Sequence, residues 1–323
     1  MSALILICSA LLDFWIGDPW NWLHPVQVMG WVIEQFKQVT FRLTKNAIAL
    51  RIAGVILTIG LGFGSAGISW GLIQLGTFLH PILGSAIAVV LLASCFAGRS
   101  LRRAGEDVIA RLDHLDEARS QLRLYVGRDT EHLSKPEILR AVLETVTENS
   151  VDGVMAPLFY ALIGAFTPVG SVAFAIAYKA VSTLDSMIGY QAPPFTDLGW
   201  FSAKTDDVLT WFPCRLTVLT LGLISGRPFE VWKLCQRDAP QDPSPNSGWS
   251  ECIYAAILKV QVGGVNYYQG VEKHKSLLGE PLQEITVDTI YQALSLTRVC
   301  FLSWLAIACL LLLQHVRLAV FAA

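Results

Sequence analysis

The sequence predicts an all-α, polytopic membrane protein with broken or re-entrant helices and with cytoplasmic helical and loop segments. Of its 323 residues, 53% are hydrophobic and 15% are charged, and the mean hydropathy is +0.50. An average soluble domain has about a quarter of its residues charged. Apolar runs alternate with polar segments, and Pro and Gly interrupt two of the runs. The net charge of -2 gives no reason to expect nucleic acid as a partner, so small molecules and the lipid bilayer are expected instead.

We expect one membrane-embedded domain over residues 1–323, with apolar segments at 2–16, 52–75, 81–97, 153–178, 208–225 and 299–314. The first segment is predicted to be retained in the membrane and not to be a signal peptide. No Lys or Arg precedes it, and Asp13 comes before any small-residue cleavage site.

A tryptophan-rich turn follows the first segment and ends near Gly30. Such a density of Trp is typical of the bilayer interface, and the turn also carries Asp13, Asp18 and His24. His24 precedes Pro25, and for this pair a capped turn and a ligand-contacting turn are both open.

Basic residues lie on both sides of the second and third apolar segments: Lys37, Arg42, Lys45 and Arg51 before them, and Arg99, Arg102, Arg103 and Arg111 after them. By the positive-inside rule both basic ends face the cytoplasm. Segments 52–75 and 81–97 therefore form a hairpin with a short outer turn at Gly76–Pro81. Six glycines between Gly54 and Gly71 suit close helix packing.

The polar segments 98–150 and 226–298 are expected on the cytoplasmic side. A turn is predicted at Gly127–Thr130 and a helix start at Ser134–Glu137. The prolines within Cys235–Glu251 and the glycine pair within Val262–Gly270 predict two loops.

The apolar segments 153–178 and 208–225 are predicted to be broken helices that line a pocket. The interrupting residues are Pro157, Pro168 and Gly170 in the first and Pro213 in the second. Broken helices at membrane depth are tolerated where they line a cavity.

Three carboxylates, Glu144, Glu148 and Asp152, follow one another at four-residue steps and would share one helix face. Like charges at this spacing weaken a helix, so cations or a metal ion are expected nearby. The alternative is a solvated acidic face. A second polar cluster lies beyond the apolar run, at Lys179–Ser186. Two polar clusters around one apolar run favour the walls of a site.

Two kinds of site are not supported by the sequence. The seven cysteines form no CxxC pair, which argues against a zinc site and a disulfide framework. The sequence has neither GxxxxGK[ST] nor GxGxxG after a strand, so an ordinary nucleotide-binding fold is not indicated.

Five stretches, in this order, resemble the adenosylcobinamide-phosphate synthases, membrane enzymes of cobalamin biosynthesis: Asp13–Gly30, Glu144–Tyr160 (ETVTENSVDGVMAPLFY), Tyr178–Tyr190 (YKAVSTLDSMIGY), Lys204–Thr217 (KTDDVLTWFPCRLT) and Asp238–Glu251 (DAPQDPSPNSGWSE). The resemblance spans nearly the whole chain.

The resemblance implies an ATP-dependent acid–amine ligation in the cell membrane, with the active site facing the cytoplasm. A propionate of adenosylcobyric acid would be joined to (R)-1-aminopropan-2-ol or its phosphate. The implied cofactors are ATP and Mg²⁺, and other late membrane enzymes of cobalamin biosynthesis are expected partners.

Such a ligation needs a metal ion, cations for phosphates, and a base. Mg²⁺ is usually held by one or two carboxylates and by phosphate oxygens; Glu148 with Asp152, or Asp206 with Asp207, are the candidates. The base is assigned to Glu144 or Asp185. The full catalytic set expected is Glu144, Glu148, Asp152, Lys179 and Asp185.

Charge-assisted contacts are the strong ones at a phosphoryl group. The expected cofactor-binding residues are Asn149, Lys179, Ser182, Lys204, Arg215, Asn246, Ser247 and Gly248. For the corrinoid, Asp13, Asp18, His24, Asn266 and Tyr267 are expected to bind, because Trp- and Tyr-rich mouths suit a wide ring with an amide rim.

Structural explanations stay open beside these roles. Lys179 and Asp185 can form an ion pair for packing, and Asp206 and Asp207 can favour a helix N-terminus. Asn246–Trp249 can be a turn with a helix cap, and the aromatic turns can anchor the protein at the bilayer interface.

Two other classes of function remain. A transporter of an anionic or corrinoid solute would also use broken helices, and a membrane sensor or assembly protein is the third class. The extensive polar sequence favours chemistry at the cytoplasmic face. We therefore expect residues 179–207 to be folded back toward a cavity open to the cytoplasm.

Overall fold

A computed structural model describes residues 2–17, 24–190 and 192–321, with side chains described as far as residue 314. The prediction for Asp18 lies outside these residues. The chain divides into two compact units, each built from separate stretches. Unit 1 comprises Met1–Ala97, Ala156–Thr210 and Trp304–Ala323, and unit 2 comprises Gly98–Met155 and Trp211–Ser303.

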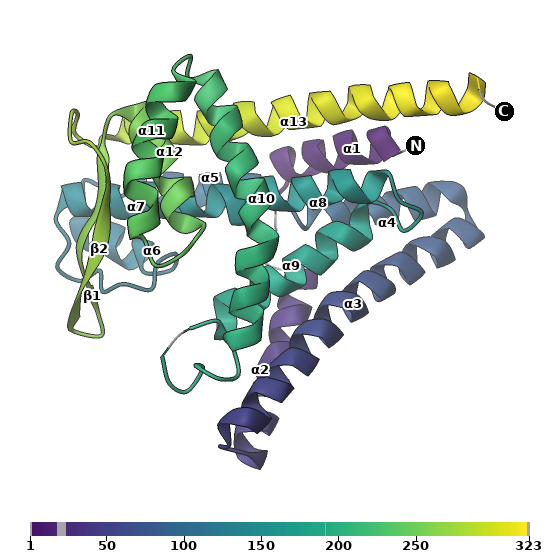
Figure 1. The fold of residues 1–323 in the computed structure, drawn as a ribbon, viewed down its shortest axis with the longest axis horizontal. Coiled ribbons are helices and arrows are strands. Elements are labelled where there is room, and N and C mark those ends of the chain that lie inside the picture. The colour runs from purple at the N-terminus through teal and green to yellow at the C-terminus, as the bar shows by residue number, and fades with distance from the viewer. Residues whose placement is uncertain (1, 18–23, 191, 322–323) are drawn as a thin grey trace. The chain divides into compact units, whose positions relative to one another are not determined.

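Unit 1 is helical in its described part. Its helices are α1 (Ser2–Trp15), α2 (Pro25–Leu43), α3 (Ala47–Leu79), α4 (Pro81–Ala93), α8 (Ala156–Ala165) and α9 (Ser171–Ile188), with parts of α10 (Trp200–Ile224) and α13 (Val287–Phe321) (Figure 1). Its core is formed by Ile33, Leu57, Leu184, Ile188 and Leu198, so α2, α3 and α9 share one buried centre.

The predicted hairpin of α3 and α4 is confirmed, and its turn is shorter than expected. Both helices run up to His80, whose side chain accepts the Ile82 N–H at 3.2 Å and caps α4. Among the glycines of α3, a Cβ on Gly54 would lie 2.1 Å from the Leu198 carbonyl oxygen, whereas Gly60, Gly64, Gly67 and Gly71 face open space. Close packing therefore explains only part of the glycine series.

The predicted break in segment 153–178 is confirmed. A π-helix (Val151–Met155) leads into α8, and a turn that ends at Gly170 separates α8 from α9. Gly170 has φ +89°, which favours glycine. With 10 residues, α8 is about 15 Å long, about half the hydrocarbon thickness of a bilayer. Helical residues also continue without a gap from α7 through the π-helix into α8, so the break in this segment is the turn before α9.

The predicted break at Pro213 is wrong, because α10 runs through it without interruption. Proline has no N–H, so the carbonyl four residues earlier, that of Leu209, loses its helical donor. The Tyr160 hydroxyl donates to this Leu209 oxygen at 2.8 Å. A side chain from α8 thus supplies the hydrogen bond that the helix backbone lacks.

Unit 2 contains α5 (Gly98–Ile109), α6 (Leu115–Leu122), α7 (Lys135–Ser150), α11 (Pro228–Asp238), a 3₁₀ turn (Ala239–Gln241) and α12 (Ser247–Leu258), with the remaining parts of α10 and α13. The predicted start of α7 is confirmed by a capping box at Ser134 and Glu137. Of the expected loop at Cys235–Glu251, only residues 242–246 lie outside a helix or helical turn.

The expected loop at Val262–Gly270 is instead most of the first strand and the turn of an antiparallel hairpin of β1 (Gln261–Tyr268) and β2 (Val271–Gly279) (Figure 1). Gly263 and Gly264, with φ of +91° and +92°, shift the register of the strand and do not end it. A Cβ on Gly263 would lie 2.0 Å from the Ser276 carbonyl oxygen of β2, so the close approach of the strands also requires glycine there.

Four helical stretches of the described chain are long and apolar enough to cross a membrane: Ala47–Leu79, Pro81–Ile109, Trp200–Ile224 and Val287–Gln314. The apolar helix α1 is shorter. The predicted all-α membrane protein with broken helices is confirmed, with one small hairpin added.

Candidate functional site

The buried carboxylate of Glu144, on α7, joins three segments of unit 2. Only 1% of its side chain is exposed, and Arg128 forms an ion pair with its Oε2. The Gly263 N–H of β1 donates to Oε1 at 2.8 Å, and Arg140 Nε lies 4.0 Å from the same oxygen. Both oxygens of Glu144 are therefore engaged.

Asn266 is held by the same two arginines. Its Oδ1 accepts from Arg128 Nη1 at 2.9 Å and from Arg140 Nη2 at 3.3 Å. Arg140 also donates to the Gly263 and Val265 carbonyls. Asn266 Nδ2 is buried and has no hydrogen-bond partner among the described residues. The strand β1 is thus fixed to α7, with one amide donor left over.

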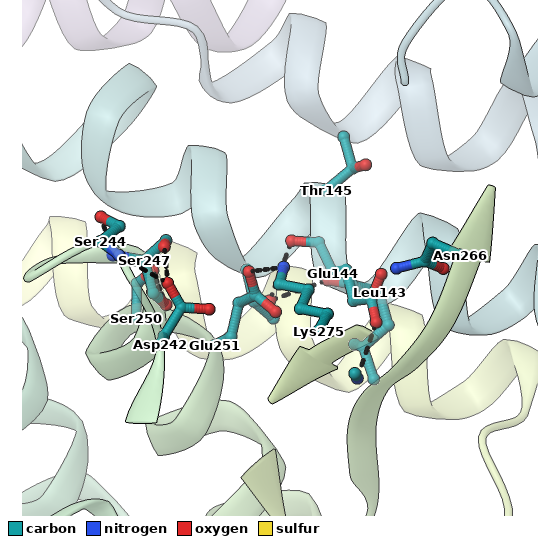
Figure 2. A network of polar contacts seen from close by, with 12 residues as sticks. Leu143, Glu144, Thr145, Asp242, Ser244, Ser247, Ser250, Glu251, Asn266 and Lys275 are labelled. Carbon is teal, nitrogen blue, oxygen red and sulfur yellow. Dashed lines mark hydrogen bonds and ion pairs between the residues drawn. The ribbon is translucent and has the colours of Figure 1, made fainter. Parts of the chain in front are cut away.

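Glu251, on α12, is as deeply buried as Glu144 but is less well matched. Lys275 of β2 donates to its Oε1 at 2.5 Å, as Figure 2 shows. Its Oε2 is buried without a partner in the described part of the chain. Burial raises the pKa of Glu251 well above its usual value, Lys275 opposes the rise, and Glu148 and Glu144 add to it.

Glu148 faces the same lysine. Burial raises its pKa, Lys275 lowers it, and Asp242 and Glu144 raise it further. Burial lowers the pKa of Lys275, but the attraction of Glu251 and Glu148 outweighs this and leaves the pKa raised. Glu144 and Glu148 of α7 and Glu251 of α12 therefore lie around one ammonium group, and Asp242 of the loop before α12 lies within electrostatic range of Glu148.

That loop, at 242–246, is tightly ordered by hydrogen bonds. Asp242 accepts the Ser244 N–H at 2.9 Å and the Ser247 hydroxyl at 3.0 Å (Figure 2). A Cβ on Gly248 would lie 2.5 Å from the Ala239 carbonyl oxygen, so this glycine allows the chain to approach itself.

Arg215 of α10 is attached to the same loop. It donates to Asn246 Oδ1 at 2.9 Å, and its guanidinium lies 4.7 Å from the ring centre of Trp249 and 5.2 Å from that of Trp211. Unit 2 thus brings Glu144, Glu148, Arg215, Asn246, Ser247 and Asn266 of the expected site into one connected region. Asp152, on the π-helix, is half-buried near Cys214 in the same unit.

Other expected site residues are in unit 1. Asp206 accepts from the Thr210 hydroxyl at 3.4 Å and lies within electrostatic range of Asp185, Asp207 and Lys179. Lys204 pairs with Asp207 at 3.4 Å on an exposed surface. Ser182 lies on α9.

The remaining expected residues take structural positions. His24 caps α2, because its Nδ1 accepts the Val26 N–H at 3.3 Å, and Asp13 is buried on α1. Asn149 is exposed and donates to the Thr145 carbonyl at 2.9 Å. Tyr267 is half-exposed and its hydroxyl donates to Glu272 at 3.1 Å. The capped turn that the sequence left open for His24 is the observed one.

Five charged members of this region were missed by the sequence analysis: Arg128, Arg140, Asp242, Glu251 and Lys275. Arg128 lies in the predicted Gly127–Thr130 turn, and Asp242 and Glu251 lie within the last of the five stretches. A charge inside a motif was the available signal for Asp242 and Glu251, and a charge inside a predicted turn was the signal for Arg128. Arg140 and Lys275 stand outside the motifs and carry no comparable signal.

Comparisons with known proteins agree with the earlier resemblance. A family model for the CobD/Cbib protein matches residues 6–297. The cobalamin biosynthesis protein CobD of Synechocystis sp. is 51% identical over 305 residues, which is 94% of this chain and 89% of that protein. The cobalamin biosynthesis protein CbiB of Salmonella arizonae is 39% identical over 302 residues, or 92% of this chain and 93% of that protein. No solved structure matches the chain.

The family match covers almost all of unit 2 and the first two stretches of unit 1, and it includes the stretches that carry Glu144, Glu148 and Glu251. The chain belongs to the CobD/CbiB family of cobalamin biosynthesis.

Proposed function

We propose that this protein catalyses an ATP-dependent amide ligation. A propionate of adenosylcobyric acid is joined to the amine of (R)-1-aminopropan-2-ol or its phosphate, and the product is adenosylcobinamide or its phosphate. The observation that carries the proposal is the meeting of two distant motifs in unit 2. Glu144 and Glu148 of the first motif and Glu251 of the second lie within electrostatic range of Lys275, and Asp242 of the second motif lies within range of Glu148.

The chemistry requires an activated carboxyl group, because a carboxylate is a poor electrophile. An acyl phosphate made from ATP is the simplest activated form. In the proposed site Arg215, Asn246 and Ser247 bind phosphate oxygens. The stacking of Arg215 against Trp211 and Trp249 and its bond to Asn246 hold the guanidinium in one orientation.

Mg²⁺ fits the donor set on α7 and the π-helix. Glu148 and Asp152 offer carboxylate oxygens, and the negative charges of Asp242 and Glu144 near Glu148 support the binding of a cation there. The described residues contain no group of three or more His, Cys, Asp or Glu placed to hold a metal. Mg²⁺ usually takes one or two carboxylates and completes its shell with phosphate oxygens and water. When bound it would neutralise phosphate charge during carboxyl activation.

Detergent-purified protein supplied with ATP, Mg²⁺, adenosylcobyric acid and the amino alcohol, free or phosphorylated, tests the ligation. We expect an amide product that requires all components, with ADP and phosphate released. Mass spectrometry of the corrinoid detects the product. Absence of product with both forms of the amine, together with corrinoid uptake into proteoliposomes, would support the transporter alternative.

The metal assignment has a separate test. Asp152→Asn should abolish ligation while corrinoid binding is retained, and Glu148→Gln should cause a milder loss that excess Mg²⁺ partly reverses. Glu117→Gln, at an exposed position on α6, is the control. A folded Glu148→Gln, Asp152→Asn double variant with normal turnover would return these residues to a solvated acidic face.

The orientation of the site is proposed to be cytoplasmic in the cell membrane. A single cysteine placed at Lys204, which is exposed on α10, should react with membrane-impermeant maleimide only when the cytoplasmic face is accessible. Labelling from the outer face alone would contradict this orientation.

A further inference from the structure

The unmatched oxygen of Glu251 is the observation that goes furthest beyond the proposed ligation. The residue is 1% exposed, and its Oε2 has no hydrogen-bond partner among the described residues. An unpaired buried polar group is costly. Glu251 was assigned no role by the sequence analysis, although it ends the last of the five motifs.

The charges around Glu251 show what kind of partner is missing. Glu148 and Glu144 of α7 face it, and Lys275 of β2 is the nearest cation. The two arginines nearby are already engaged, since Arg128 pairs with Glu144 and Asn266, and Arg140 binds the Gly263 and Val265 carbonyls. Asp242 adds further negative charge at Glu148. The region beside Glu251 therefore has more acidic than basic groups available.

A primary ammonium group is a better partner for the unpaired Oε2 of Glu251 than a metal ion is. An ammonium has three N–H donors and no acceptor, so it can satisfy a single carboxylate oxygen without a full set of oxygen ligands. Mg²⁺ requires near-octahedral oxygen coordination, and Lys275 Nζ already lies 2.5 Å from the other oxygen of Glu251.

We propose that Glu251 Oε2 binds the ammonium group of the amino alcohol. The inference rests on the proposed ligation, for which it names the amine subsite. Lys275 then fixes the carboxylate by Oε1, and the substrate nitrogen is held at Oε2. The subsite lies next to Asp242, Asn246 and Ser247, the loop proposed to bind phosphate, so amine and activated carboxyl are brought to the same part of unit 2.

The test compares two ligands that differ in one group, the ammonium of 1-aminopropan-2-ol phosphate and the hydroxyl that replaces it in propane-1,2-diol 2-phosphate. Binding to the full-length protein in detergent is measured by calorimetry without ATP. The wild type should prefer the amine by about tenfold or more, as expected for a charge-assisted hydrogen bond. Glu251→Gln should bind both ligands equally, and Glu284→Gln, at an exposed position, should keep the preference.

Three results would overturn the inference. The first is equal binding of the two ligands by the wild type, which needs no variant to fold. The second is an undiminished preference in folded Glu251→Gln. The third is that Glu251→Gln no longer binds Mg²⁺, measured with MgCl₂ alone, while its preference for the amine is unchanged. Glu251 would then be a metal ligand.

The outcome is separable from that of the proposed function. Ligation at the wild-type KM for the amine in Glu251→Gln would refute the subsite and leave the ligation standing. A clear amine preference in a wild-type protein that forms no amide would refute the ligation and leave the subsite standing.

Discussion

The region around Glu144 and the region around Glu251 each bury a carboxylate, but the two carboxylates differ in how many of their oxygens are paired. At Glu144, both oxygens are occupied, by a guanidinium and by a backbone N–H. At Glu251, one oxygen binds a lysine and the other has no partner in the described chain. A fully paired buried carboxylate holds the fold together, whereas a half-paired one retains capacity for a ligand. Within unit 2, we therefore assign Glu144 to stability and Glu251 to ligand binding.

The largest effect is expected from Glu144→Gln. It leaves Arg128 buried without its counter-charge, and breaking a buried pair in this way costs about 3–5 kcal/mol. Unfolding in detergent, followed by circular dichroism, measures the loss. Glu117→Gln is the exposed control. A loss of under about 1 kcal/mol would mean that the Glu144 network does not stabilise unit 2.

Lys275→Met should be less destabilising than Glu144→Gln, and its effect should depend on pH. The variant leaves Glu251 without its cation, but burial already raises the pKa of Glu251, so this carboxyl can take up a proton instead. A carboxyl whose pKa is raised in the folded state contributes stability below its unfolded pKa, and this contribution is lost as pH rises through the folded pKa.

The stability of Lys275→Met should therefore be greatest below the unfolded pKa of this carboxyl, about 4.5, and should fall as pH rises above it, more steeply than that of the wild type. Adding Glu251→Gln should reduce this extra slope, because Glu251 no longer titrates, and Glu148, whose pKa Lys275 also lowers, accounts for the remainder. Parallel pH profiles of stability for Lys275→Met and the wild type would show that Lys275 does not control the charge of Glu251. The contrast between the two regions would then be wrong.

The hydrogen bond between the Tyr160 hydroxyl and the Leu209 carbonyl tests, without charges and with a smaller effect, whether a polar group needs its partner. Tyr160→Phe removes the donor to the Leu209 carbonyl, and we expect a loss of about 1 kcal/mol. Pro213→Ala provides a backbone donor for that carbonyl, so Tyr160→Phe should cost almost nothing in the Pro213→Ala background. Thermal unfolding of the four proteins gives the coupling energy. Equal costs in both backgrounds would show that the tyrosine does not compensate for the proline.

The smallest effect is expected at the exposed start of α7. The Glu137 carboxylate accepts from the Ser134 N–H at 2.7 Å and from its hydroxyl at 2.6 Å, and these bonds with the Ser134 side chain and backbone lower the pKa of Glu137. The stabilisation is present above pH ~4.5 and is lost as pH falls through the lowered pKa. Glu137→Gln should flatten this acid-side dependence, and Glu117→Gln should not.

Local features of the sequence predicted much of the fold. Long apolar runs indicated α3 and the last helix, Ser134 with Glu137 indicated the start of α7, and Gly170 indicated the end of the α8–α9 turn. Each of these features was indicated by residues that lie within it or next to it in the sequence.

Features that depend on distant partners were missed. The continuity of α10 at Pro213 requires Tyr160, and the strand at Gly263 requires the facing carbonyl of Ser276. In the site, the spacing of Glu144, Glu148 and Asp152 indicated that they share one helix face. Nothing near Glu148 in the sequence points to Lys275. Propensity rules treat Pro and Gly pairs as breakers, and here tertiary contacts override them.

The interleaving of the two units has a consequence for how the chain is made. Unit 1 needs three stretches of chain and unit 2 needs two, and the second stretch of unit 2 comes late. Glu144 and Glu148 therefore leave the ribosome long before Gly263 and Lys275, and they must stay hydrated until those partners arrive. Closure between such distant segments is slow. The burial of the acidic end of α7 is thus completed only when the hairpin of β1 and β2, with Gly263 and Lys275, docks on it.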